Sequence, residues 1–392
     1  GSMLVQYAIT WHVALDTLSG IWVTLFTCAA MLPTVIISPF AGVWADRYNR
    51  KTLINIADGA IAVSTLILAF VIHAGHDSII LMLIVVAMRG FGQGVQQPSV
   101  SALIPQLVPA EHLARFNGIQ ATTQSLTMFA SPMLAGVLVT FLPIQYIFFI
   151  DVATAAIGIA VVFFCVHVTK PEYTAKSSGF KAYIAEIKEG LDLIMQTPWL
   201  RLMLLYMAGF CICMAPAAML TPLQAARTFG QDYWRLTAIE MLFSIGMMAG
   251  GIAISIWGGF RNRMRTITLA CFAFGLTTFL FGVVPNFWIY LGVMLLCGAT
   301  VPFFNTPAMT IMQTQVEPHI MGRVMSVSSM INGVAMPLGM LIFGPLGDVV
   351  RIETLLIIAG TLLFASGFVL LASKSLIAAG EPTTPPSTEV AS

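Results

Sequence analysis

The chain has 392 residues, of which 58% are hydrophobic and 9% are charged, and its formal net charge is +1. A soluble domain needs roughly 25% charged residues to cover its surface, so this composition excludes a soluble globular fold and predicts a surface that faces lipid. The small net charge gives no reason to expect a nucleic-acid partner, and none is predicted.

Apolar segments long enough to cross a bilayer as helices recur along the chain, which predicts an all-α membrane protein. We place twelve spans at residues 1–14, 20–41, 52–73, 79–104, 114–141, 145–168, 199–221, 234–257, 265–284, 287–312, 324–346 and 354–374. The first is too short to cross about 30 Å of hydrocarbon, so we expect a truncated first helix.

The spans form two groups of six. Residues 1–168 and 199–374 are the predicted six-helix bundles, and the linker 169–198 has apolar residues at helical spacing between Phe180 and Ile194. That spacing predicts an amphipathic helix on the membrane surface. Residues 375–392 have the composition of a disordered tail.

The two groups share an internal repeat. Residues 108–138 align with residues 316–346 at a constant offset of 208, and Asn49 aligns with Asn262 at an offset of 213. Two pseudo-symmetric bundles that enclose a midplane site are expected of a transporter that rocks between two open states.

Lys and Arg residues are unevenly distributed between the two predicted sides of the membrane. Fourteen of the 18 fall on one side, and only Arg227, Arg235 and Arg351 fall on the other. Because positive residues favour the cytoplasmic side, both termini are predicted to be cytoplasmic.

The segment between the second and third spans, residues 42–51, packs four charges into a tight turn and resembles the loop signature of the major facilitator superfamily. The residues that match, Gly42, Asp46, Arg47, Arg50 and Lys51, are predicted to form a conformational latch through contacts with helix ends. Asn49 stands where the signature has glycine, and we expect it to accept the left-handed conformation. The alternative is a loop whose charges only orient the protein.

Two further segments resemble motifs of the same family. Ser131, Pro132 and Gly136 in the fifth span resemble its antiporter motif, although Ser131 replaces a glycine. Arg89 in the fourth span resembles its buried arginine, and such a charge needs a partner or a wet cavity within the membrane.

Carboxylates at membrane depth are functional candidates by default. Glu240 is the leading candidate for proton coupling, followed by Asp151 and Asp58, because a carboxylate among apolar groups binds a proton more readily. Each has a structural alternative: Glu240 and Asp58 as hydrogen-bonded groups, and Asp151 as the counter-ion of Arg89.

Polar residues on otherwise apolar spans are expected to line the substrate cavity. Those selected are Gln6, Thr10, Trp11, Gln93, Gln97, Gln124, Asn305 and Asn332. Any one of them could instead form a hydrogen bond between helices. His12 is expected to be a buried histidine with its hydrogen bonds satisfied.

No cofactor, metal site or enzyme activity is predicted. The six cysteines lie in apolar segments and lack metal or redox spacing, and no nucleophile–base pair or phosphate loop is recognisable.

Over most of its length the chain resembles the macrolide-efflux and siderophore-exporter branch of the major facilitator superfamily. The resemblance rests on the loop around Asp46, the acidic positions Asp58 and Asp151, Glu240, and the segment 317–324. It implies a monomeric antiporter of a bacterial cytoplasmic membrane that exports drugs, macrolides or siderophores in exchange for protons. The alternative is an importer or uniporter of a nutrient, lipid or metal.

Overall fold

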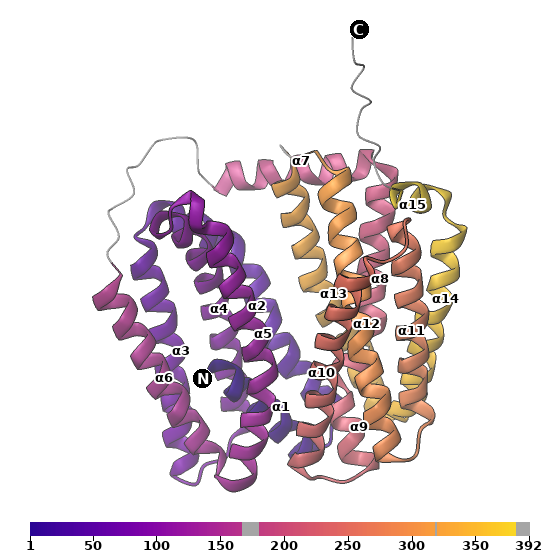
Figure 1. The fold of residues 1–392 in the computed structure, drawn as a ribbon. Helices are drawn as coiled ribbons and strands as arrows, with labels where there is room; N and C mark the ends of the chain where they lie inside the picture. Colours follow the sequence, from indigo (N-terminus) through magenta and orange to yellow (C-terminus); the bar gives the residue numbers. More distant parts are fainter. Residues whose placement is uncertain (167–179, 318–319, 382–392) are drawn as a thin grey trace. The chain divides into compact units, whose positions relative to one another are not determined.

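The structure, a computed structural model, describes residues 1–166, 180–317 and 320–381, except for the side chains of Asp46, Ala110, Ala114 and residues 180–187. Within these ranges the chain forms helices and no strand. Figure 1 shows helices α2 to α6 running side by side.

Each predicted span corresponds to a helix. In the first half these are α1 (Ser2–Thr17), α2 (Gly20–Arg47), α3 (Arg50–His73), α4 (Ile79–Leu107), α5 (Ala110–Phe141) and α6 (Ile144–Cys165). In the second half they are α8 (Pro198–Met219), α10 (Tyr233–Trp257), α11 (Arg263–Val283), α12 (Phe287–Gln315), α13 (Met321–Val349) and α14 (Ile352–Ala372).

Eleven helical segments of the described chain are long and apolar enough to cross a membrane. With α1, which has 16 residues, they account for the twelve predicted spans. The prediction of an all-α membrane protein is therefore confirmed.

Three shorter helices lie between or after the spans. The predicted amphipathic helix of the linker is present as α7 (Phe180–Gln196). The sequence did not predict α9 (Thr221–Thr228), and it was wrong to begin a disordered tail at residue 375, because α15 (Lys374–Ala379) is helical there. The rest of the predicted tail, residues 382–392, lies outside the described residues.

The helices form two compact units, which are described separately. Unit 1 contains Gly1–Glu186, Ala215–Met241 and Gly333–Ile352. Unit 2 contains Ile187–Met214, Leu242–Asn332 and Glu353–Ser392. Unit 1 thus includes the first six spans, the whole of α9 and parts of α7, α8, α10 and α13. The predicted boundary between two six-helix bundles stays a prediction.

Small residues bring helices into close contact in each unit. In unit 1, Gly90 of α4 lies against the backbone of α2, and the Thr34 hydroxyl donates to the Gly90 carbonyl at 2.7 Å. In unit 2, Gly298 of α12 lies against the backbone of α10. Close backbone approach of this kind stabilises helix pairs in lipid, where burying apolar surface gives no driving force.

The internal repeat is also visible at helix ends. Asn49 is the N-cap of α3 and Asn262 is the N-cap of α11, and each side chain accepts a hydrogen bond from the backbone two residues later at 3.0 Å. The two caps keep the offset of 213 predicted from the sequence.

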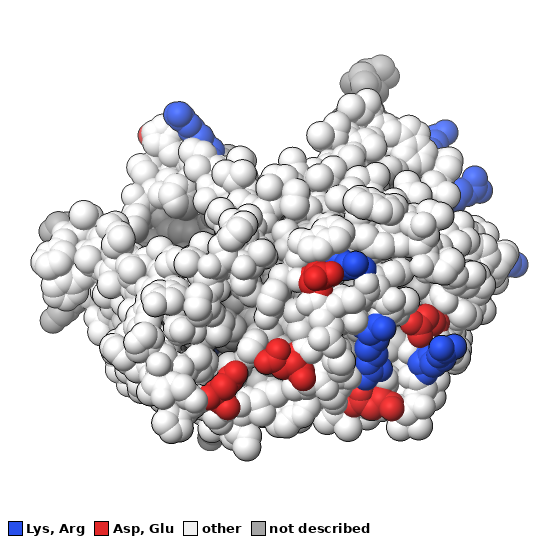
Figure 2. Space-filling view, turned by 90° about the horizontal axis from the view of Figure 1, so that it is seen from below, with Lys and Arg blue, Asp and Glu red and all other residues white. Residues whose placement is uncertain are grey.

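The outward surfaces are apolar. Exposed large side chains include Ile157 and Phe164 on α6, Ile256 on α10, and Phe368 and Val369 on α14. Figure 2, a view towards one end of the helices, shows a mostly uncharged face with a few acidic and basic side chains. The exposed apolar side chains of α6, α10 and α14 suit a lipid environment.

Candidate functional site

A buried ion pair lies in the interior of unit 1. Arg89 of α4 and Asp151 of α6 are 1% and 2% exposed, and Nη1 of Arg89 lies 2.6 Å from Oδ2 of Asp151. Nη1 also donates to the Thr65 hydroxyl on α3 at 2.7 Å, and Nη2 donates to the Ser2 carbonyl at 3.1 Å. The arginine therefore holds α1, α3, α4 and α6 together through one charged group.

Asp58 of α3 lies in a less enclosed position. Its carboxylate accepts a hydrogen bond from the Gln96 amide of α4 at 2.7 Å, and both side chains are half-buried. Asp58 is thus held by a neutral partner rather than by a cation.

Glu240 differs from both other carboxylates. It lies two turns into α10, is half-buried, and is close enough to the Tyr7 side chain of α1 to interact with it electrostatically. Among the described residues, no hydrogen bond or ion pair holds the Glu240 carboxylate. A carboxylate without fixed partners can gain or lose a proton with little rearrangement.

The predicted latch loop contacts two neighbouring helices. Nε of Arg50 donates to the Ala45 carbonyl at 2.9 Å, and its Nη1 donates to the Ala102 carbonyl of α4 at 2.6 Å. Nζ of Lys51 donates to the carbonyls of Phe163 and Val166 at 2.6 and 2.8 Å. Cations placed on the last carbonyls of a helix are favoured by its dipole.

The remaining latch residues are placed as follows. Gly42 and Arg47 lie on the last turns of α2, and the side chain of Asp46 lies outside the described residues. The expectation that Asn49 adopts a left-handed conformation is wrong, because its φ is −63°. Asn49 instead caps α3, which requires an extended conformation that asparagine adopts readily.

The residues of the predicted antiporter motif lie on α5. Ser131 is buried, and Pro132 lies inside the helix. A Cβ at Gly136 would overlap the Thr237 side chain of α10, so glycine is needed for the close contact of these two helices.

One cavity of unit 1 lies along α5. It has a volume of about 390 Å³ and is lined by Met3, Phe116, Ile119, Gln120, Thr123, Gln124 and Thr127. The four polar residues recur at helical spacing on one face of α5. Of the predicted cavity residues, Gln124 lies here.

A smaller cavity of about 90 Å³ lies between α1 and α2. The predicted residues Gln6 and Thr10 line it together with Phe26, Thr27 and Met31. Trp11 was wrongly predicted to line a cavity, since it is 1% exposed and packs against Tyr7 with ring centroids 5.5 Å apart. Neighbouring helices cover the indole on every side.

The other predicted cavity residues lie on α4, α12 and α13. Gln93 and Gln97 are on α4, half-buried and exposed, respectively. In unit 2, Asn305 is exposed on α12, and Asn332 accepts a hydrogen bond from Cys211 at 3.7 Å and donates one to Ser328 at 3.5 Å. Gln93 and Gln97 are not among the residues that line the cavity of Gln124.

A clamp that the sequence did not predict lies at the start of α2. The Asp348 carboxylate of α13 accepts hydrogen bonds from the backbone of Gly20 at 2.6 Å and Ile21 at 3.0 Å, and from the Ser19 hydroxyl at 2.7 Å. Ser19 itself makes no capping hydrogen bond, so Asp348 caps α2 from a different helix. A carboxylate at this position is stabilised by the helix dipole.

Arg227 of α9 completes this clamp. Its Nη2 lies 2.8 Å from Oδ1 of Asp348, its Nη1 donates to the Gly347 carbonyl at 2.6 Å, and its Nε donates to the Leu18 carbonyl at 3.1 Å. All of these residues belong to unit 1. Hence α2, α9 and α13 are joined at the side of the membrane predicted to face outward. One feature of the sequence pointed to this clamp: Arg227 is one of only three Lys or Arg residues predicted to lie on the outer side.

Comparison with known proteins gives consistent matches over most of the chain. The profile of the Major Facilitator Superfamily matches residues 1–340. Macrolide efflux protein A of Streptococcus pyogenes is 26% identical over 370 residues, which cover 94% of this chain and 91% of that protein. Macrolide efflux protein A of Enterococcus faecalis is 28% identical over 311 residues, which cover 79% and 96%, respectively. A crystal structure of a variant of the nucleoside transporter NupG superposes with a TM-score of 0.70 at 15% identity, covering 94% of this chain and 97% of that chain.

Proposed function

Because the chain belongs to the Major Facilitator Superfamily, we propose that it is a proton-coupled exporter of amphiphilic small molecules, such as macrolides, other drugs or siderophores. It would work by alternating access in a bacterial cytoplasmic membrane. The likeness to two macrolide efflux proteins over most of the chain supports export, and the composition of the cavity supports the substrate class.

The observation that carries this proposal is the lining of the cavity on α5. Amide and hydroxyl groups from Gln120, Thr123, Gln124 and Thr127 alternate with Met3, Phe116 and Ile119, and none of these residues is charged. Pockets with a mainly apolar lining and a few polar groups suit molecules that have both kinds of surface. A methionine and a phenylalanine can adapt to different shapes, as expected of a site with several substrates.

The arrangement of the three carboxylates supports Glu240 as the proton carrier. Asp151 is neutralised by Arg89 at 2.6 Å, and Asp58 is held by Gln96. Glu240 lies two turns from the predicted outer end of α10, and protonation would remove a charge that would otherwise be carried across the membrane potential, at about 2.3 kcal/mol per 100 mV.

Two groups of contacts at opposite ends of the spans support alternating access. Arg50 and Lys51 of the latch loop bind helix ends on the predicted cytoplasmic side, and Asp348 with Arg227 binds α2 on the predicted outer side. Under the proposal, these contacts form and break as each side opens.

The proposal is tested with the intact protein reconstituted into liposomes under an imposed pH gradient. A panel of a macrolide, a cationic dye and a siderophore is offered. We expect gradient-dependent accumulation of at least one of them, abolished when the gradient is collapsed. Transport of every tested compound at the same rate with and without the gradient would exclude proton coupling.

A matched pair of variants tests the cavity itself. Thr123 lines the cavity, whereas its neighbour Thr122 does not, and both hydroxyls donate to the α5 backbone at 2.9 Å. Thr123→Ala is expected to raise the KM for the exported compound, whereas Thr122→Ala should leave it unchanged. Equal effects of the two substitutions would remove this face of α5 from the substrate site.

A further inference from the structure

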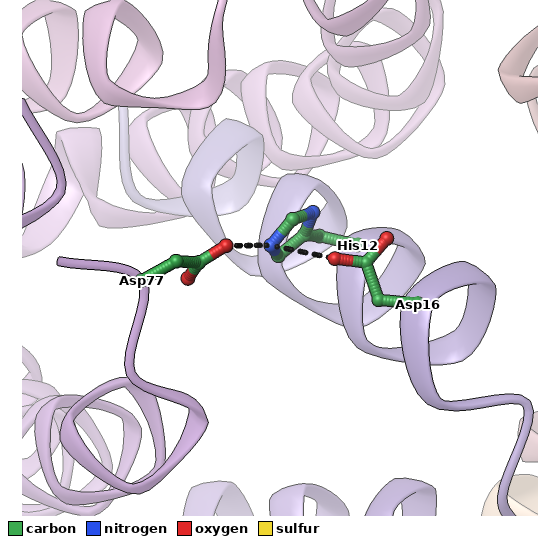
Figure 3. Close-up of side chains that lie close together, drawn as sticks. All are labelled: His12, Asp16 and Asp77. Carbon is green, nitrogen blue, oxygen red and sulfur yellow. Dashed lines mark ion pairs between the residues drawn. The ribbon is translucent and has the colours of Figure 1, made fainter. Parts of the chain in front are cut away.

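Three side chains that commonly bind metal ions meet at the end of α1 furthest from Gly1. His12 and Asp16 lie one turn apart on α1, and Asp77 reaches them from the loop between α3 and α4 (Figure 3). Their ligand atoms all lie within 4.8 Å of one another. His12 is less buried than predicted, because the imidazole is partly exposed, and its polar partners are two carboxylates.

A single nitrogen of His12 faces two carboxylate oxygens, which differs from a histidine that donates to one acceptor. Nε2 of His12 lies 3.2 Å from Oδ2 of Asp16 and 3.3 Å from Oδ2 of Asp77. One Nε2–H group has a single direction, so it cannot donate a strong hydrogen bond to both oxygens, whether the imidazole is neutral or charged. Both distances are close to the edge of a tetrahedral metal site, about 3.4 Å for ligands about 2.1 Å from the ion.

The charge of the cluster also favours a cation. Among the described residues, no Lys or Arg forms an ion pair with Asp16 or Asp77. Two carboxylates around a neutral imidazole leave two negative charges, which one divalent ion would balance. The side chains of Asp16 and Asp77 are 55% and 56% exposed, so an ion here would keep water as its remaining ligands.

We propose that His12, Asp16 and Asp77 bind a first-row divalent cation such as Zn²⁺. The imidazole nitrogen favours Zn²⁺, Ni²⁺ or Cu²⁺ over Mn²⁺, Mg²⁺ and Ca²⁺, which prefer oxygen ligands. The ion connects α1 to the loop 74–78, whose turn is shaped by Gly75 with φ of +83°. It therefore braces α1 against the segment that leads into α4. This site does not depend on which molecule the protein exports.

The test uses the intact protein in detergent, with any histidine tag removed and metals stripped by a chelator. Zn²⁺ binding is measured by calorimetry, and Co²⁺ binding by visible absorption, which separates nitrogen and oxygen ligation from binding to the free cysteines. We expect a single site that lacks a thiolate band and raises the thermal unfolding temperature.

Three variants identify the ligands. His12→Ala and Asp77→Asn should each weaken binding by more than about tenfold, since even residues behind the ligands contribute that much. His76→Ala is the matched control, because His76 is an exposed histidine next to Asp77 but outside the cluster, and it should bind as the unchanged protein does. Asp77 lies in an exposed loop, so Asp77→Asn is expected to fold even if His12→Ala does not. The binding measurement on Asp77→Asn then tests the site by itself. Absence of Zn²⁺ binding, or equal binding by Asp77→Asn, overturns the proposal.

Discussion

Glu240 illustrates how the surroundings of a single side chain determine what it can do. Its carboxylate has no fixed partner among the described residues, whereas Asp151 lies against a guanidinium and Asp58 against an amide. A proton bound by Asp151 would leave Arg89 charged in an apolar interior, which is costly. The same proton bound by Glu240 leaves no unbalanced charge.

Glu240→Gln is therefore expected to uncouple transport. Accumulation driven by a pH gradient should fall to the background level, while exchange of substrate without a gradient persists, because the glutamine mimics a permanently protonated carboxyl. Both activities are measured in the same liposomes. Asp192→Asn, a substitution at an exposed carboxylate of α7, serves as the control. Full gradient-driven accumulation by Glu240→Gln would assign the proton to another group.

Asp151→Asn is expected to destabilise the protein rather than to uncouple it. Removing one partner of a buried ion pair costs about 3–5 kcal/mol, because the other charge stays buried without compensation. The measurement is thermal unfolding in detergent. The double substitution Arg89→Met with Asp151→Leu should recover most of the loss. An Asp151→Asn protein of unchanged stability would contradict this interpretation of the pair.

At the scale of helices, the clamp formed by Asp348 and Arg227 can be tested by a single substitution. Asp348→Asn removes the charge from the cap of α2 and from the pair with Arg227, and each such hydrogen bond is worth about 1.5–3 kcal/mol. We expect α2 to open more readily at Ser19, so a cysteine at that position should react several times faster with a membrane-impermeant maleimide.

The control for the clamp is a second Asp–Arg pair. Asp232 and Arg235 form an ion pair at 3.1 Å across three residues at the start of α10, and Asp232 is not part of the clamp. Arg235 also donates to the Phe229 carbonyl at the end of α9. Asp232→Asn should therefore leave the labelling rate at position 19 unchanged. If Asp348→Asn also left it unchanged, the clamp would not hold the start of α2.

The close contact between α5 and α10 at Gly136 leads to a further prediction. Gly136→Ala should lower stability or slow transport, because the added methyl group would overlap Thr237. Gly118 on the same helix has no atom within 4 Å of such a methyl group, so Gly118→Ala should be neutral or stabilise by up to about 1 kcal/mol. Thermal unfolding of both variants gives the comparison. Equal stability of the two would show that the contact is not tight.

At the scale of the whole chain, the uneven distribution of Lys and Arg predicts which side each segment faces. Single cysteines are introduced at Lys188 and at Gln231, both exposed, in a protein without its six native cysteines. An impermeant maleimide added to intact cells should label position 231 and not position 188. Labelling at position 188 alone would reverse the predicted orientation.

The sequence predicted the spans and the repeat because both depend on local or periodic patterns. It could not predict contacts between distant residues, such as Asp348 with Gly20, since nothing in either segment indicates the other. It missed α9 because eight residues with little apolar character fall below the length of a span. Trp11 was misplaced because its polar nitrogen suggested a cavity, whereas the packing of neighbouring helices decides its exposure.

The equivalent caps at Asn49 and Asn262 allow the same substitution to be compared in the two halves of the repeat. Both side chains accept the same hydrogen bond at the same length, at the start of helices that correspond in the repeat. A helix loses about 1 kcal/mol when such a cap becomes alanine, whatever else the helix does. If Asn49→Ala and Asn262→Ala differ in their effect on the transport rate, the difference shows that one helix start contributes to transport beyond its role in folding. Comparing the two equivalent caps thus separates an effect on helix stability from an effect on the transport rate.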